Sequence, residues 1–222
     1  MAEHRQDFER DLEAIEAKII ELFAIVAEDI PEATKALLTG NNEIMQKLLE
    51  RDKVVSALYP ETEQLANREI LLQAPVADDL RFLLAVLRVL TEFELSHDLV
   101  IQIASRANHF LADDLSPRTR GIVERMGSVV ADMWRQAADC WYQRDRSAAL
   151  AVAERDDEMD QLYSSLIAEL ASGQMALPVT MDMTLVARFY ERLGDHAVTI
   201  ARRVVFLAGS AGSAGSAGPV GE

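Results

Sequence analysis

The chain has 222 residues, half of them apolar, and its 37 Asp and Glu against 22 Lys and Arg give a formal net charge of −15. Proteins bind a polyanion through clustered Lys and Arg, and no segment of this sequence has such a cluster, which argues against a nucleic-acid-binding protein. The acidic excess suits binding of a cation or of a basic partner surface, and frequent Ala, Leu, Glu and Arg favour an all-α fold.

The first predicted helix covers about 7–39, where apolar residues recur three or four positions apart and leave Glu and Lys on the opposite face. We expect Pro31 to kink or restart this helix and Asp29 to serve as a local cap. The turn sequence TGNN, at 39–42, predicts the end of the helix.

The second predicted helix covers about 43–72, and Pro60 is expected to kink it. Pro75 opens a third helix, which closes near Ser116 in the sequence ADDLSP. The remainder of the chain repeats this plan, with helices expected over about 118–141, 145–171 and 179–208.

Two recurring patterns indicate an internal duplication. The pattern ERD, five residues and LY occurs at 50–59 and again, 104 positions later, at 154–163. The third helix of each half also matches the other, at an offset of 97 positions. The matching residues of the first copy are Val89, Glu94, Asp98, Ile103, Ala104 and Arg106.

The duplication predicts two tandem three-helix bundles built from six long helices, with a first bundle over 1–113 and a second over 114–208. The bundles need not be independent domains, because similar halves can pack along a shared long axis. The remaining residues, 209–222, are rich in Ala, Gly and Ser and are expected to form a flexible tail.

Pairs of acidic residues form the candidate site. Two carboxylates four positions apart project from the same helical face, and the recurrence of such a pair at equivalent positions of both halves is a stronger signal than the spacing alone. If the second and third helices of a half lie side by side, each half presents an oxygen-rich patch to Mg²⁺, Mn²⁺, Zn²⁺ or iron. The candidate metal ligands are Glu94, Asp98 and Asp52 in the first half and Glu191, Asp195, Asp156 and Asp160 in the second.

Other interpretations of these residues stay open. In the second half, Arg155, Arg188 and Arg192 could pair with the acids and form a salt-bridged helix face. His196 could ligate a metal, although a single histidine beside an acidic face is more often a hydrogen-bonding group.

The segment Glu94-Leu95-Ser96-His97 has the Glu-x-x-His spacing used by di-iron helical bundles, which need two such elements. The second copy has Gly194 where the second histidine would be required, so a di-iron oxidase is not favoured. The sequence contains no Gly-rich phosphate loop, nucleophile elbow or Cys/His nucleophile arrangement. We therefore do not expect an enzyme.

The sequence also bears on the compartment. No apolar run reaches the roughly 18 to 20 residues that cross a bilayer, and the first residues, MAEHRQDFERDLE, are too charged for a signal peptide. A cytoplasmic protein is therefore expected. The single cysteine, Cys140, cannot form an internal disulfide, and the nearby Trp134 and Trp141 indicate an ordinary core position.

Several motifs together carry a family resemblance: QAPVADDLR at 73–81, the two ERD…LY segments, ELSHD at 94–98 and ERLGDHAVTIA at 191–201. They resemble the PhoU family of phosphate-transport accessory proteins. The resemblance covers roughly residues 5–208 and implies a pair of three-helix bundles that bind metal through acidic motifs. It also implies a negative regulator of the phosphate-starvation response that relays the state of an ABC phosphate importer, through its ATPase, to a membrane sensor histidine kinase.

The first motif departs from the family pattern. Where the family has Arg-Ile-Gly-Asp-His, the chain has Leu-Ser-His-Asp-Leu at 95–99, which keeps Glu94 and Asp98 but moves the histidine to the other side of Asp98. The position four beyond each aspartate, often Asn or Asp in relatives, is Gln102 or Thr199 here. The resemblance therefore predicts metal binding more strongly for the second half.

The leading hypothesis is a non-enzymatic cytoplasmic adaptor that reaches the membrane only through its partners. The alternative is a carboxylate-bridged metalloenzyme, with a site buried between helices, or a metal store. The sequence leaves open whether the protein is a monomer or a homodimer.

Overall fold

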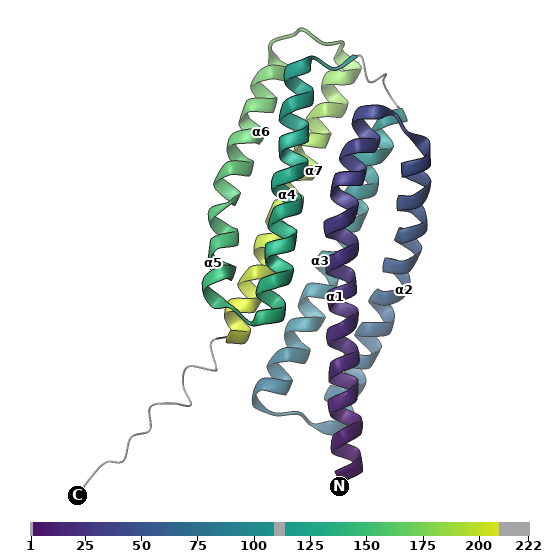
Figure 1. The fold of residues 1–222 in the computed structure, drawn as a ribbon, viewed down its shortest axis with the longest axis vertical. Helices are drawn as coiled ribbons and strands as arrows, with labels where there is room; N and C mark the ends of the chain where they lie inside the picture. The colour runs from purple at the N-terminus through teal and green to yellow at the C-terminus, as the bar shows by residue number, and fades with distance from the viewer. Residues whose placement is uncertain (1, 109–113, 209–222) are drawn as a thin grey trace, which may run out of the picture.

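The structure is a computed structural model that describes residues 2–108 and 114–208, so the predicted tail at 209–222 lies outside the described residues. Within those two ranges the chain is helical except for short connections and contains no strand, which confirms the all-α prediction (Figure 1). The helices are α1 (Ala2–Thr39), α2 (Asn42–Gln73), α3 (Ala77–Ser105), the 3-10 helix η1 (Arg106–Asn108), α4 (Pro117–Gln143), α5 (Arg146–Glu154), α6 (Asp156–Ala171) and α7 (Leu177–Ala208).

The turn between α1 and α2 follows from its sequence. Gly40 adopts a φ of 67°, a left-handed conformation that costs little without a Cβ, and it ends α1. The side chain of Asn41 then accepts a hydrogen bond from the backbone N–H of Glu43 and caps α2. The predicted end of the first helix is thereby confirmed.

Other predicted boundaries differ from the structure. The helix does not restart at Pro31, which lies inside α1 as Pro60 lies inside α2, because the neighbouring turns and tertiary packing hold the helix across the missing N–H. The third helix begins at Ala77 and ends at Ser105, well before the predicted end near Ser116.

The helix predicted over 145–171 is divided into two. Asp145 caps α5 by accepting hydrogen bonds from the N–H groups of Ser147 and Ala148. α5 ends at Glu154, Arg155 stands between the segments, and α6 begins at Asp156. α5 and α6 follow one another along the outside of the second bundle and together take the place of one long helix (Figure 1).

The two bundles lie side by side. α1, α2 and α3 pack on one another in the first bundle, and α4 to α7 do so in the second. The bundles meet through α1 against α4 and α3 against α7, so α2 and the α5–α6 pair lie on opposite outer flanks (Figure 1). The shared long axis is therefore part of the fold.

Aromatic side chains fill the junction between the bundles. The ring centroid of Phe23 lies 4.8 Å from that of Phe93 and 6.2 Å from those of Trp134 and Trp141. All four side chains are fully buried, and they belong to one apolar core that spans both halves. Such rings remove large apolar areas from water, so the halves stabilise each other.

A buried polar contact also joins the bundles. The hydroxyl of Tyr190 on α7 lies 2.7 Å from Oγ1 of Thr34 on α1, and that Oγ1 donates to the carbonyl of Ile30 at 2.8 Å. Nearby, the lack of a side chain at Gly127 on α4 lets this helix approach Thr34 closely. These contacts fix the two bundles in one relative position.

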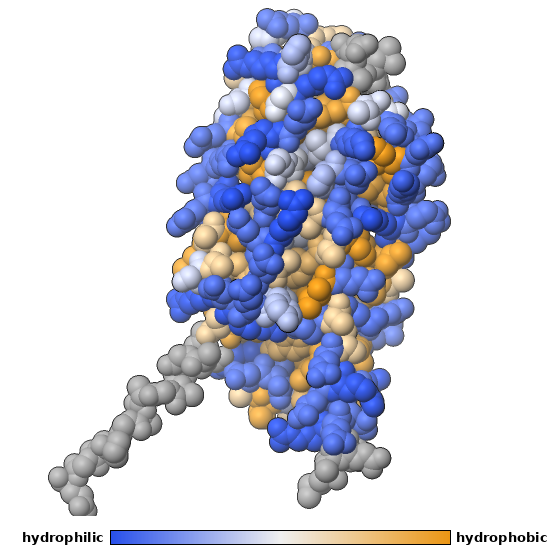
Figure 2. All heavy atoms as spheres, in the orientation of Figure 1, coloured by the Kyte–Doolittle hydropathy of each residue, from blue (hydrophilic) through white to orange (hydrophobic). Residues whose placement is uncertain are grey.

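Hydrophilic side chains predominate on the face seen in Figure 2, with apolar groups between them along the bundle. Among the described residues, no helix combines the length and the apolar composition that crossing a bilayer requires.

Candidate functional site

The predicted acidic residues lie on α2 and α3 in the first half and on α6 and α7 in the second. Four of them are exposed and three are half-buried, so none is sealed inside a bundle. The exposed residues are Glu94, Asp98, Asp160 and Asp195, and the half-buried residues are Asp52, Asp156 and Glu191.

The four acidic residues of the second half influence one another, and we call Asp156, Asp160, Glu191 and Asp195 the second-half acidic cluster. Burial, followed by repulsion from Asp195 and Asp160, raises the pKa of the Asp156 carboxyl, although Arg202 opposes this shift. Burial and the charge of Asp195 likewise raise the pKa of Glu191. A bound cation would relieve this repulsion.

The arginines near this cluster compensate only part of its charge. Nη1 of Arg188 lies 2.6 Å from Oε2 of Glu191, so the salt-bridge interpretation holds for this residue. Arg155 instead approaches Asp132, at 3.5 Å. Over 2–108 and 114–208, no three His, Cys, Asp or Glu side chains stand in an arrangement that could hold a metal ion.

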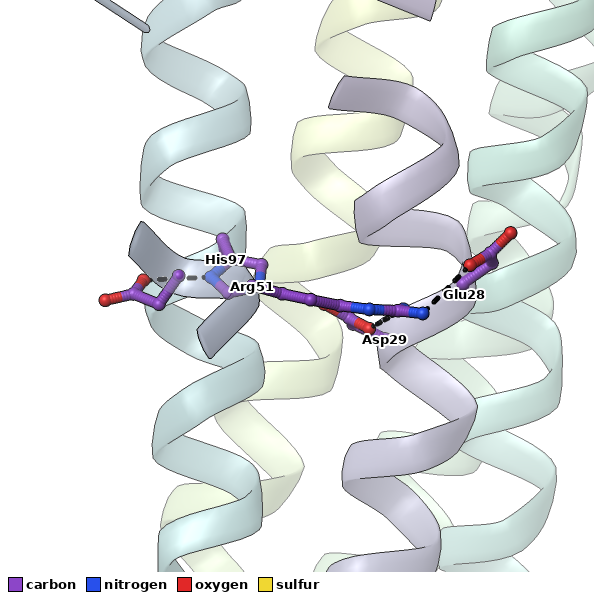
Figure 3. A network of polar contacts seen from close by, with 5 residues as sticks. Glu28, Asp29, Arg51 and His97 are labelled. Atoms are coloured by element: carbon purple, nitrogen blue, oxygen red, sulfur yellow. Dashed lines mark hydrogen bonds and ion pairs between the residues drawn. The ribbon is translucent and has the colours of Figure 1, made fainter. Parts of the chain in front are cut away.

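The first half places a histidine among its acids (Figure 3). Nε2 of His97 lies 3.0 Å from Oδ2 of Asp29 on α1, and Nδ1 lies 3.0 Å from Oδ1 of Asp52 on α2. Arg51 pairs with the other oxygen of Asp29 and, at 3.3 Å, with Glu28. We call these five residues the His97 network.

The geometry of the network determines the charge on its histidine. Each ring nitrogen of His97 faces a carboxylate oxygen, which can only accept, so both nitrogens must carry a hydrogen. Burial lowers the pKa of His97, but the hydrogen bonds and charges of Asp29 and Asp52 outweigh it and raise the pKa above its ordinary value. Protonation of His97 is thus favoured, and the ring links α1, α2 and α3.

Three members of this network, Glu28, Asp29 and Arg51, were not predicted as site residues from the sequence. Asp29 was expected to cap a helix, but its side chain is 1% exposed and accepts from His97 and Arg51. Its position three residues after the core residue Val26 was a signal, because it places a carboxylate on the apolar face. Arg51 lies within the recurring ERD pattern, but only the fold shows its partner.

His196, which sequence reasoning left between ligand and hydrogen-bonding group, is buried between the halves. Its Nδ1 lies 2.9 Å from Oε2 of Glu92 on α3. The approach is an ion-pair contact without hydrogen-bond geometry, since the nitrogen has no hydrogen-bond partner among the described residues. His196 thus contacts an acid across the α3–α7 junction.

The two halves use equivalent positions differently. Arg155 and Asp132 of the second half pair as Arg51 and Asp29 do in the first, at offsets of 104 and 103 positions. At the position equivalent to His97, however, the second half has Gly194. No side chain there reaches the carboxylates.

Comparison with known proteins agrees with this duplicated plan. The profile of the PhoU domain matches residues 19–107 and 123–204, once in each bundle. The chain belongs to the PhoU family. A relative from Zymomonas mobilis, named phosphate-specific transport system accessory protein PhoU homolog, is 34% identical over 205 residues, which are 90% of this chain and 86% of the relative. A protein of the same name from Caulobacter vibrioides is 30% identical over 93% of this chain and 92% of its own length.

Solved PhoU structures share the fold. The crystal structure of PhoU from Pseudomonas aeruginosa matches with a TM-score of 0.83 at 26% identity, over 90% of this chain and 98% of that chain. The PhoU regulatory protein from Streptococcus pneumoniae matches with a TM-score of 0.81 at 23% identity, over 90% and 96% of the two chains, and this likeness concerns the fold alone.

The PhoU motifs imply a metal at each acidic patch, and the two halves fit one differently. In the first half, Asp52 is already the hydrogen-bond acceptor of His97. In the second, Asp156 and Glu191 are each repelled by Asp195 and Asp160, and carboxylate oxygens are the donors that a hard cation prefers, although Arg188 pairs with Glu191.

Proposed function

We propose that this PhoU protein is a phosphate-transport accessory protein that acts in the cytoplasm. The observation that carries the proposal is the match of both helical bundles to the PhoU domain, together with near full-length relatives named for the phosphate-specific transport system. Its finer role is negative regulation of the phosphate-starvation response, as an adaptor between the ATPase of an ABC phosphate importer and a sensor histidine kinase.

The fold supports an adaptor in physical terms. The common core makes the two bundles one body with fixed outer helix faces. A rigid face can favour one conformation of a partner simply by binding it more tightly than the other. The exposed carboxylates of α3 and α7 suit a partner surface that is basic.

Deletion and complementation would test this role. Cells that lack the protein should express phosphate-scavenging genes in phosphate-rich medium, and the wild-type gene should restore repression. Pull-down of the importer ATPase and of the cytoplasmic part of the kinase should retain both partners. Unchanged expression in the deletion strain would refute the regulatory proposal.

Charge reversal would locate the contact surface. Glu94→Lys with Asp98→Lys, on the exposed face of α3, should weaken partner retention. Glu21→Lys with Glu124→Lys changes the same charge on exposed positions of α1 and α4 and serves as the matched control. Equal loss in both variants would show that net charge matters and not this face.

Cation binding by the second-half acidic cluster is a second candidate function. It is favoured by the repulsion among these carboxylates, which adds to burial in raising the pKa of Asp156 and Glu191 and which a cation would relieve, although no three described side chains already stand in a metal-holding arrangement. Elemental analysis and Mn²⁺ titration of the wild type should show binding that Glu191→Ala with Asp195→Ala abolishes. Metal content unaffected by that double change would remove the assignment and leave the adaptor role standing.

The carboxylate-bridged enzyme considered from the sequence does not have the geometry it needs. Its Glu94 is exposed on α3, whereas His97 is buried and holds Asp29 and Asp52. The two ends of the Glu-x-x-His element therefore face different surroundings.

A further inference from the structure

We infer that His97 takes, in the first half, the place between carboxylates that a metal ion would occupy, and so closes this half to metal ions. The inference uses the same carboxylate chemistry as the proposed cation site of the second half. It is independent of the adaptor role.

The contacts of His97 leave little room for another cation. Both oxygens of Asp29 are engaged, Oδ2 by the ring and Oδ1 by Arg51, and Oδ1 of Asp52 receives the second ring nitrogen at 3.0 Å. The side chains of His97 and Asp29 are each 1% exposed. A metal that used Asp52 together with Asp29 would have to displace the ring and break both of its hydrogen bonds.

The ring also supplies the charge that a metal would supply. With both nitrogens donating, His97 is positive and lies between the carboxylates of α1 and α2 (Figure 3). With Arg51, it provides two positive charges for the three carboxylates of Glu28, Asp29 and Asp52. The first half therefore carries its own counter-ions.

The second half shows the same place without the ring. A Cβ added to Gly194 would meet Oδ1 of Asp156 and Cε of Met133, each at 3.6 Å, in ordinary contact. A side chain at this position would thus start out beside Asp156, as His97 lies beside Asp52. Gly194 therefore leaves Asp156 without the ring that Asp52 has in the first half.

The residues that remain in the first half do not replace what His97 holds. Glu94 and Asp98 are exposed on α3, and Asp52 is directed to the ring. Two carboxylates on one helix offer fewer ligands than the six or more oxygens that a hard cation takes from protein and water together. Removal of the ring would free Oδ1 of Asp52 and Oδ2 of Asp29, whereas Oδ1 of Asp29 would remain with Arg51.

The test measures Mn²⁺ binding in a parent whose second half is silenced by Glu191→Ala and Asp195→Ala. The full-length parent is compared with the same chain carrying His97→Ala or, separately, His97→Gly. Calorimetry gives the affinity, and paramagnetic broadening of backbone amides near Asp29 and Asp52 locates the ion. His196→Ala, which removes the other histidine found buried among the residues whose side chains the structure describes, is the matched control.

We expect removal of His97 to tighten Mn²⁺ binding to the first half by at least about tenfold, the scale on which supporting residues alter metal affinity. His196→Ala should leave it unchanged, and circular dichroism should confirm that each variant is folded. Mn²⁺ affinity that is equal to or weaker than that of the parent in both His97 variants would overturn the inference.

The reciprocal change separates this inference from the second-half site. Gly194→His in the otherwise native chain should weaken Mn²⁺ binding to the second half by a similar factor. If the native second half binds no Mn²⁺, the proposed cation site fails, but the His97 comparison in the silenced parent still decides the inference.

Discussion

The contact between Thr34 and Tyr190 predicts an unequal response to two small substitutions. Since Thr34 donates its hydrogen to the carbonyl of Ile30, the phenol of Tyr190 must be the donor between the two hydroxyls. Tyr190→Phe removes that donor and leaves Thr34 with a partner, so it should cost about 1 kcal/mol. Thr34→Val leaves a fully buried phenol unpaired and should cost about 2 kcal/mol.

Unfolding in urea, followed by the fluorescence of the buried Trp134 and Trp141, measures these costs. The double variant should cost less than the two single changes together, by about 1 kcal/mol, because the unpaired phenol is gone. Tyr190→Phe costing as much as Thr34→Val, or costs that simply add, would refute this account of the contact.

Three further predictions concern packing, ionisation and reactivity. Gly127→Ala would drive its Cβ into Oγ1 of Thr34 and should destabilise the protein by about 1 to 2 kcal/mol in the same urea titration. A Thr34→Ala background should reduce this loss of stability. The control, Gly121→Ala, places its Cβ in open space and should be neutral or stabilising. Because folding raises the pKa of His97, its contribution to the free energy of unfolding should be full below a pH of about 6.5 and should be lost as the pH rises through the pKa of the folded state. The difference in free energy of unfolding between the wild type and His97→Gln should therefore narrow between pH 6 and 9. A difference that stays constant would contradict this. Burial raises the pKa of Cys140 to about 11, so iodoacetamide should label it slowly at pH 8 in the folded protein and rapidly in urea, and rapid native labelling would show an accessible thiolate.

Much of the fold could be predicted from the sequence because each helix leaves its own apolar period. The repeat of ERD…LY and of the third helix predicted the duplicated bundles, which the PhoU profile and solved structures confirm. The division at Arg155 was not predicted, because the core residues Val152 and Met159 on either side of it are two helical turns apart, a spacing that one continuous helix also has. Conversely, the helix restart expected at Pro31 does not occur, because packing maintains α1 where local propensity would interrupt it.

The candidate site was less predictable because it depends on contacts between helices. Spacing along α3 gave the exposed pair Glu94 and Asp98, but it could not show that the intervening His97 turns inward. The sequence does show that the first half has His97 where the second half has Gly194. Only the fold shows that the His97 ring contacts Asp29 on α1. Whether the acidic residues bind metal stays a prediction.

The aromatic junction around Phe23 and Trp134 has a consequence for how the two halves evolve. Each copy buries part of its core against the other, so neither copy has to be stable alone. The protein can then tolerate a substitution in one copy, such as histidine for glycine, without unfolding. The two copies can therefore acquire different properties. The core that the two copies share is thus what allows their corresponding positions to differ.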